Sequence, residues 1–98
     1  MDVDEWLNKG LALDKLFRYQ DSLDAYEKAL SLDPTTAIAW YGKGITLGNL
    51  DRYQESLDAF ENVLSLDPSY AEVLYNNGFS VESLGKFKEF WNFLRKRN

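Results

Sequence analysis

The stretch WLNKGLALDKLFRYQDSLDAYEKALSLDP, from Trp6 to Pro34, decides the fold because the chain repeats it. Trp40 to Pro68 reads WYGKGITLGNLDRYQESLDAFENVLSLDP, and 18 of the 29 aligned positions are identical after a shift of 34 residues. Repetition at a fixed period of about 20–50 residues is typical of proteins built from stacked units. A second shift aligns residues 74–98, but only 4 of 25 positions then match. We therefore predict a single domain, residues 1–98, with units at about 3–36, 37–70 and 71–98, the third diverged from the others.

Each unit is predicted to be a pair of helices, because apolar residues recur every three or four positions in each half. Trp6 and Leu13 belong to the first of these stripes. Proline closes the first two units, since it cannot continue a helix and disfavours helical backbone in the residue before it. The hydroxyls of Thr35, Thr36 and Ser69 are expected to cap the helices that follow. The chain is thus predicted to be all-α, with six antiparallel helices near residues 3–16, 19–32, 37–50, 53–66, 71–84 and 87–97.

Three glycines, Gly10, Gly44 and Gly78, lie in the middle of predicted helices at the repeat spacing. A glycine there costs about 1 kcal/mol relative to alanine. Such a recurring cost indicates a packing reason, namely that the second helix of each unit approaches the first closely. Ser22 and Ser56 are small residues at the facing position of the second helix.

The composition excludes several classes of function. The chain has no cysteine and no histidine, so it lacks thiolate metal ligands, a cysteine nucleophile and the most common general base. Its net charge of −5 disfavours a nucleic-acid partner. No apolar run approaches the roughly 20 residues that span a bilayer, and the first residues, MDVDE, do not resemble a secretory signal. We expect no enzyme activity, no cofactor, no metal, no nucleic-acid or membrane partner, and a cytoplasmic location.

The 34-residue helix-turn-helix unit resembles the tetratricopeptide repeat in its W-x3-G-x2-L pattern, later small and aromatic residues, and closing proline. The resemblance covers residues 3–98. It implies a right-handed α-solenoid of three units, the last a diverged cap, that serves as a scaffold for protein–protein interaction. The residues that match the family pattern are Trp6, Gly10, Leu13, Ser22, Tyr26, Ala29 and Pro34 in the first unit, and Trp40, Gly44, Leu47, Ser56, Phe60, Val63 and Pro68 in the second.

The resemblance also implies that the first helices of the units line a concave groove that binds a peptide or a helix of a partner protein. Two apolar columns then emerge, one headed by Leu7 and the other by Leu11. Exposed apolar stripes with Tyr and Phe are typical of binding surfaces, although some of these side chains could instead pack between units. The predicted groove residues are Leu7, Asn8, Leu11, Tyr41, Ile45, Tyr75, Asn76 and Phe79.

Chaperone co-factors of this family bind a C-terminal carboxylate through lysine, asparagine and other basic residues. This chain lacks that pattern, so the resemblance implies a groove without a carboxylate clamp. Asp4 and Asp14 are expected at the rim, which favours a partner with apolar side chains and basic flanks. The positions that correspond to the clamp are Leu7, Leu11, Gly42, Glu72 and Asn76.

The last predicted helix supports an alternative function. Residues 1–84 carry 6 basic and 15 acidic side chains, whereas residues 85–98 carry 5 basic and 1 acidic. Head-to-tail contact of the basic end of one chain with the acidic body of another would close into a ring or continue as a filament. Exchange of a terminal helix pair between two chains, or a homodimer through the aromatic last helix, is a related alternative. The chain could equally be a fragment of a longer repeat array. The predicted self-association face consists of Trp91, Phe93 and Leu94.

Overall fold

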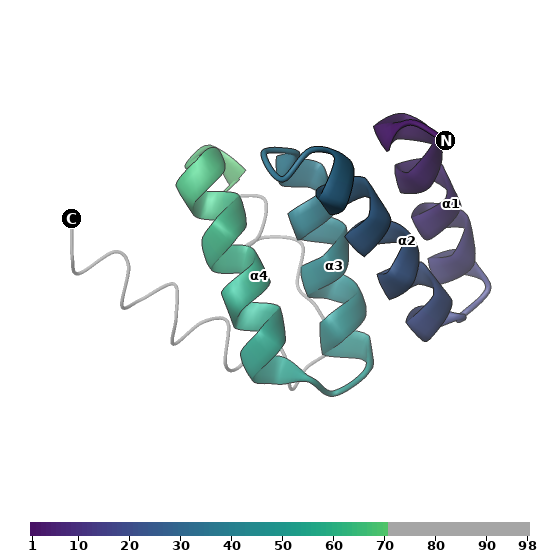
Figure 1. Ribbon diagram of the computed structural model, residues 1–98. Helices are drawn as coiled ribbons and strands as arrows, with labels where there is room; N and C mark the ends of the chain where they lie inside the picture. Colours follow the sequence, from purple (N-terminus) through teal and green to yellow (C-terminus); the bar gives the residue numbers. More distant parts are fainter. Residues whose placement is uncertain (71–98) are drawn as a thin grey trace.

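The computed structural model describes residues 1–70, which are all-α and contain four complete helices and no strand (Figure 1). Each helix begins at the predicted residue and ends within one residue of the predicted end. The third unit and its two helices, predicted for residues 71–98, lie outside the described residues. The helices are α1 (Val3–Lys15), α2 (Tyr19–Leu32), α3 (Ala37–Asn49) and α4 (Tyr53–Leu66).

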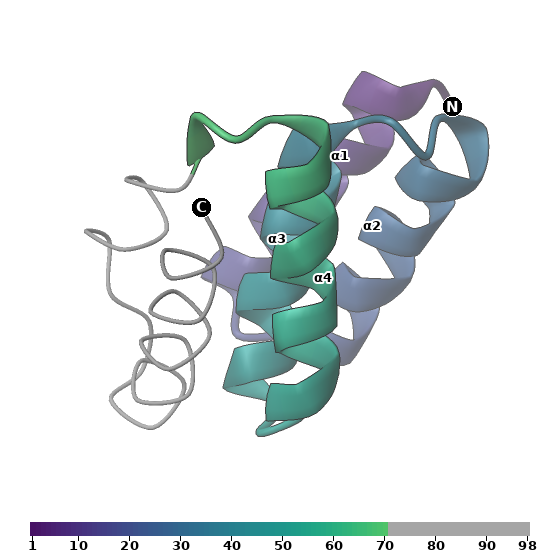
Figure 2. The ribbon, with the colours of Figure 1, turned by 90° about the vertical axis from the view of Figure 1, so that its left-hand side faces the viewer.

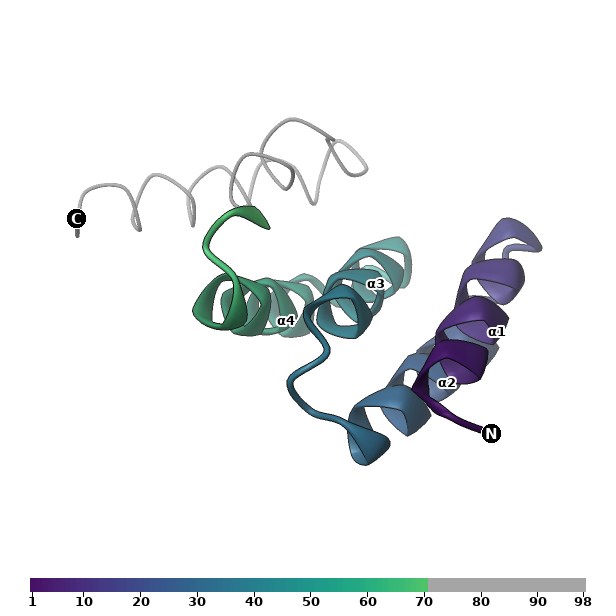
Figure 3. The same cartoon turned by 90° about the horizontal axis from the view of Figure 1, so that it is seen from above.

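The helices form two hairpins that lie side by side in chain order (Figure 1). Seen from above, α1 and α2 form one pair and α3 and α4 the other (Figure 3). Figure 2 looks along the row, with α4 nearest the viewer and the first pair behind it. Contacts join α2 to α3 and also α1 to α3, so the second hairpin packs on both helices of the first. This arrangement is consistent with stacked helical repeats.

The acidic residues at the start of the chain cap the first helix. The Asp2 carboxylate accepts a hydrogen bond from the Glu5 backbone N–H at 2.9 Å, and the Glu5 carboxylate accepts one from the Asp2 N–H at 3.2 Å. This reciprocal pair satisfies two backbone donors that a helix start leaves without partners. Negative charge also suits the positive end of the helix dipole.

The hydroxyl caps expected for α3 are wrong, and the helix that Ser69 is expected to cap lies outside the described residues. Thr35 donates its hydroxyl to the Asp33 carboxylate at 2.6 Å and its backbone N–H to the same oxygen at 3.0 Å. Ser69 makes the same two bonds to Asp67. Thr36 is the N-cap residue of α3 but makes no side-chain capping bond. An aspartate two residues earlier competes for these hydroxyls and closes a local turn, and the hydrogen bonds from Thr35 lower the pKa of Asp33.

Trp40 connects the two hairpins. Its side chain packs against all three buried apolar clusters of the described residues, and its indole N–H donates to the Pro34 carbonyl at 2.8 Å. Burial of aromatic surface dominates the energy of such a small core. The clusters are Phe60 with Val63, Leu23 with Leu47 and Ala59, and Ala29 with Leu30 and Ala39.

The predicted close approach of the helices in each pair is confirmed at Gly10 and Gly44; Gly78 lies outside the described residues. The hydroxyls of Ser22 and Ser56 donate to the carbonyls of these glycines at 2.9 and 2.6 Å. The space that a side chain would need is filled by a ring from the second helix. A Cβ atom on Gly10 would lie 2.6 Å from Cε1 of Tyr26, and one on Gly44 would overlap Phe60.

The turns between paired helices have positive φ angles at Phe17 (60°) and Asp51 (61°), where glycine is favoured. In the first turn the Arg18 N–H donates to the Leu13 carbonyl at 2.9 Å, and the Phe17 N–H donates to the Asp14 carbonyl. The second turn repeats both bonds. This is the usual hydrogen-bond pattern of a helix end that closes with one left-handed residue.

Phe17→Gly is expected to be more stable than Phe17→Ala by about 1 kcal/mol, because only glycine adopts the left-handed conformation without a Cβ clash. Both variants remove the ring, which is 76% exposed and contacts Tyr19 edge-on. Their difference therefore isolates the backbone conformation. Urea denaturation of the two variants measures it, and equal midpoints would rule out strain at this turn.

Candidate functional site

Five of the eight predicted groove residues lie in the described part of the chain, on α1 and α3. Positions four apart on one helix share a face, so Leu7 and Leu11 lie together on α1, as do Tyr41 and Ile45 on α3. The other three, and the predicted self-association face, lie outside the described residues: Tyr75, Asn76, Phe79, Trp91, Phe93 and Leu94.

Three of the five groove residues also pack against the core. Leu7 is half-buried against the cluster of Ala29, Leu30 and Ala39, which joins the two hairpins. Tyr41 and Ile45 are half-buried against Phe60 and Val63. The Tyr41 ring lies 6.4 Å from the Phe60 ring and 5.9 Å from the Tyr70 ring, measured between centroids. Replacing Tyr41 would therefore disturb the fold as well as the surface.

The side chains of this region that remain open are Leu11, which is 47% exposed, and Ile38, which is 49% exposed. Leu11 lies on α1, and Ile38 lies in the first turn of α3, a helix that contacts α1. Asn8 is exposed one turn before Leu11. We call this set of exposed residues on the two first helices, Asn8, Leu11 and Ile38, the α1/α3 face.

Asp14, expected at the rim of the groove, is bound within the fold. Its carboxylate accepts a hydrogen bond from the Tyr26 hydroxyl at 2.9 Å and one from the Thr46 hydroxyl at 3.0 Å. Tyr26 is 1% exposed and Thr46 is 0% exposed. Burial, reinforced by the hydrogen bond to Asp14 and by its charge, raises the pKa of the Tyr26 phenol. Asp14 thus joins α1, α2 and α3, a role that helical periodicity did not predict.

A signal for this role is present in the repeat itself. In the second unit Phe60 replaces Tyr26 and Gly48 replaces Asp14, so the phenol and the carboxylate are absent together. A buried tyrosine hydroxyl needs a hydrogen-bond partner, whereas a phenylalanine ring does not. The paired difference between two otherwise similar units therefore identifies residues that contact each other.

Gly42, which corresponds to a clamp position, is buried and presents no side chain to a ligand. The Tyr26 ring lies against it from the first hairpin, and a Cβ atom at this position would lie 2.6 Å from Cζ of the ring. Tyr26 is thereby held between Gly10 of its own unit and Gly42 of the next. Gly42 is a packing position between the units.

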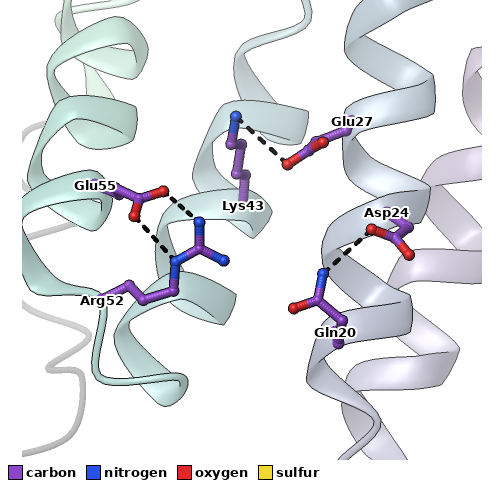
Figure 4. Close-up of polar contacts among 6 residues, drawn as sticks. All are labelled: Gln20, Asp24, Glu27, Lys43, Arg52 and Glu55. Atoms are coloured by element: carbon purple, nitrogen blue, oxygen red, sulfur yellow. Dashed lines mark hydrogen bonds and ion pairs between the residues drawn. The ribbon is translucent and has the colours of Figure 1, made fainter.

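Polar and charged side chains of α2, α3, α4 and the turn before α4 form hydrogen bonds and ion pairs (Figure 4). Arg52 pairs with Glu55 within α4 and its preceding turn, and Lys43 of α3 lies 4.0 Å from Glu27 of α2. Lys43 also lies over the Trp40 ring, 5.1 Å from its centroid. Exposed pairs of this kind contribute well under about 1 kcal/mol each. Of the two, only the pair of Lys43 and Glu27 joins the two hairpins.

Within residues 1–70, no three acidic side chains gather in a way that could hold a metal ion. None of α1–α4 has the length and apolar character that a bilayer span requires. The described residues thus offer two features for interpretation, the exposed α1/α3 face and the hydrogen bonds of Asp14 within the fold.

Comparison with known proteins identifies the family. A family model described as tetratricopeptide repeat matches residues 3–36 and 37–70, which are the two units found from the internal repeat. A search among curated proteins gives no match. The matched segments span more than half of the chain and coincide with the helix pairs α1–α2 and α3–α4. The chain therefore belongs to the tetratricopeptide repeat family.

Proposed function

We propose that the chain is a protein-interaction scaffold whose α1/α3 face binds a peptide or a helix of a partner protein. Tetratricopeptide repeats generally mediate protein–protein interactions, which supports this class of function. The observation that carries the proposal is the exposure of Leu11 and Ile38 on the first helices of neighbouring units. A peptide that lies across two neighbouring first helices could contact both apolar side chains.

The partner segment is proposed to be apolar with basic flanks and to need no free C-terminal carboxylate. Of the positions that correspond to the clamp, Leu7, Leu11 and Gly42 lie in the described part and carry no charge. Asp4 is exposed on α1, one turn before Asn8 of the face, and the whole chain carries a net charge of −5. Complementary charge at a rim increases the association rate and the specificity of binding.

Selection from a library of displayed random peptides tests this proposal. Leu11→Asp and Ile38→Asp are each expected to lower the affinity for the selected peptides by about tenfold or more, since a charge replaces an apolar contact. Both side chains are about half exposed, so circular dichroism melts should remain close to those of the parent chain.

Leu32→Asp provides the matched control, because Leu32 is an exposed leucine at the end of α2 and lies outside the α1/α3 face. It should leave the affinity unchanged. Peptides that bind all three variants as tightly as the parent chain would refute the assignment of this surface.

A further inference from the structure

The two units present the same cleft twice, at the outer junction of their paired helices. In the first unit it lies between α1 and α2 and has a volume of about 460 Å³. In the second it lies between α3 and α4 and measures about 200 Å³. Residues 34 positions apart line the two clefts, and five of these pairs are identical: Trp6 and Trp40, Lys9 and Lys43, Leu13 and Leu47, Asp24 and Asp58, and Ala25 and Ala59.

The chain's own α2 lies against the residues that line the cleft of the second unit. Leu23 of α2 forms one buried cluster with Leu47 and Ala59. The Glu27 carboxylate lies 4.0 Å from the Lys43 ammonium (Figure 4). Leu30 belongs to a second cluster, against which Trp40 packs. The segment that covers these residues therefore has the pattern Leu-x3-Glu-x2-Leu on one face of a helix.

The first unit keeps these lining residues, but no helix of the described part lies against them as α2 lies against the second unit. Leu13 is half-buried, and Lys9 is exposed with its ammonium 5.2 Å from the centroid of the Trp6 ring, as Lys43 is over Trp40. Lys28 adds a second cation where the other unit has Asn62. Arg18 and Asp21, which pair with each other, and Asp24 also line this cleft. The larger cleft thus offers the apolar residues Trp6 and Leu13 with Lys9 and Lys28 beside them, as Trp40, Leu47 and Lys43 lie beside α2 in the second unit.

We propose that this cleft is a second docking site, which binds an amphipathic helix of a partner protein with the pattern Leu-x3-(Glu/Asp)-x2-Leu. The two leucines would contact Trp6 and Leu13, which are half-buried, and the acidic side chain would meet Lys9. A second copy of the chain is a poor source of this helix. Its α2 already buries Leu23 and Leu30 against α3, and helix-in-groove binding requires a free apolar face.

The test uses a synthetic peptide of residues 18–34, which contains the segment that covers the other cleft. Gln20 and Asp24 are exposed and hydrogen-bonded one turn apart at 3.3 Å (Figure 4). The change Gln20→Lys in the peptide allows a lactam to Asp24 that favours the helix, because a helix this short is marginal alone. Fluorescence anisotropy of the labelled peptide should show saturable binding to the full chain.

Charge reversal identifies the site. Lys9→Glu in the chain is expected to lower the affinity for the peptide by about fivefold or more. Glu27→Lys in the peptide should restore its affinity for that variant. The matched control is Lys43→Glu, the same residue type in the cleft that α2 already covers, and it should leave the affinity unchanged. Leu13→Asp should weaken binding by about tenfold.

Several outcomes would overturn the proposal. One is the absence of saturable binding, and another is equal binding by the Lys9→Glu variant. Loss of binding on Leu11→Asp would place the helix on the α1/α3 face instead, so the two docking proposals can fail separately. Self-association of the unliganded chain that Lys9→Glu abolishes, seen by sedimentation, would show that the cleft holds a second copy and not a partner.

Discussion

Asp14→Ala is expected to lower the free energy of unfolding by about 3 kcal/mol, although Asp14 is neither apolar nor fully buried. The change removes the acceptor for the hydroxyls of Tyr26 and Thr46, which are 1% and 0% exposed. A buried hydroxyl without a partner costs about 1–3 kcal/mol. Two such hydroxyls would be left without a partner at the contact between the hairpins. The lost free energy of unfolding is therefore lost from the packing of the second hairpin on the first.

Tyr26→Phe is expected to recover a large part of this loss when combined with Asp14→Ala, because it removes one of the two stranded hydroxyls. The second unit already uses this solution, with Phe60 and Gly48 at the equivalent positions. Urea denaturation of the two single variants and the double variant gives the coupling energy between the residues.

The control for this prediction is Asp24→Ala, since Asp24 is an exposed aspartate whose hydrogen bond is to Gln20 on the same helix. It should change stability by less than about 0.5 kcal/mol. Strict additivity of Asp14→Ala and Tyr26→Phe would contradict the proposed network, even if each variant is destabilised.

The bounds of the four described helices could be predicted because the signals for them are local and occur twice. Pro34 and Pro68 stop helices at the same point of each unit, and the apolar spacing fixes the buried face. The hydroxyl caps were mispredicted for a local reason as well. The Thr35 hydroxyl can accept a bond from an N–H at the helix start or turn toward the Asp33 carboxylate as a donor, and the sequence alone does not show that it does the second.

Helical periodicity alone could not predict contacts over long sequence separations; for Asp14 and Tyr26 the available signal is their joint replacement in the second unit. Asp14 bonds to residues 12 and 32 positions later, and helical periodicity gives the face of a residue but not its partner on another helix. The same limit applies to the groove columns. Leu11 and Ile45 are equivalent by register, yet Leu11 is exposed and Ile45 is half-buried against Phe60 and Val63.

The contact between Tyr26 and its two glycines shows how a single side chain sets the distance between units. Gly10 contacts the ring from α1 and Gly42 contacts it from α3. The hydroxyl is fixed by Asp14 at 2.9 Å, so the ring cannot slide along its plane to make room. Interiors packed at crystal-like density transmit such a clash to their neighbours.

Gly42→Ala is therefore expected to destabilise the chain by about 2–3 kcal/mol, because overpacking at the Tyr26 ring outweighs the gain of about 1 kcal/mol in helix propensity. Thermal unfolding followed by circular dichroism measures the change. Ala12→Gly, at an exposed site of α1, measures the difference in helix propensity between alanine and glycine where no ring would clash, and with the opposite sign. Tyr26→Leu, which shortens the side chain, should reduce the cost of Gly42→Ala in the combined variant. A Gly42→Ala chain as stable as the parent would show that the hairpins separate without loss and that Tyr26 does not set their spacing.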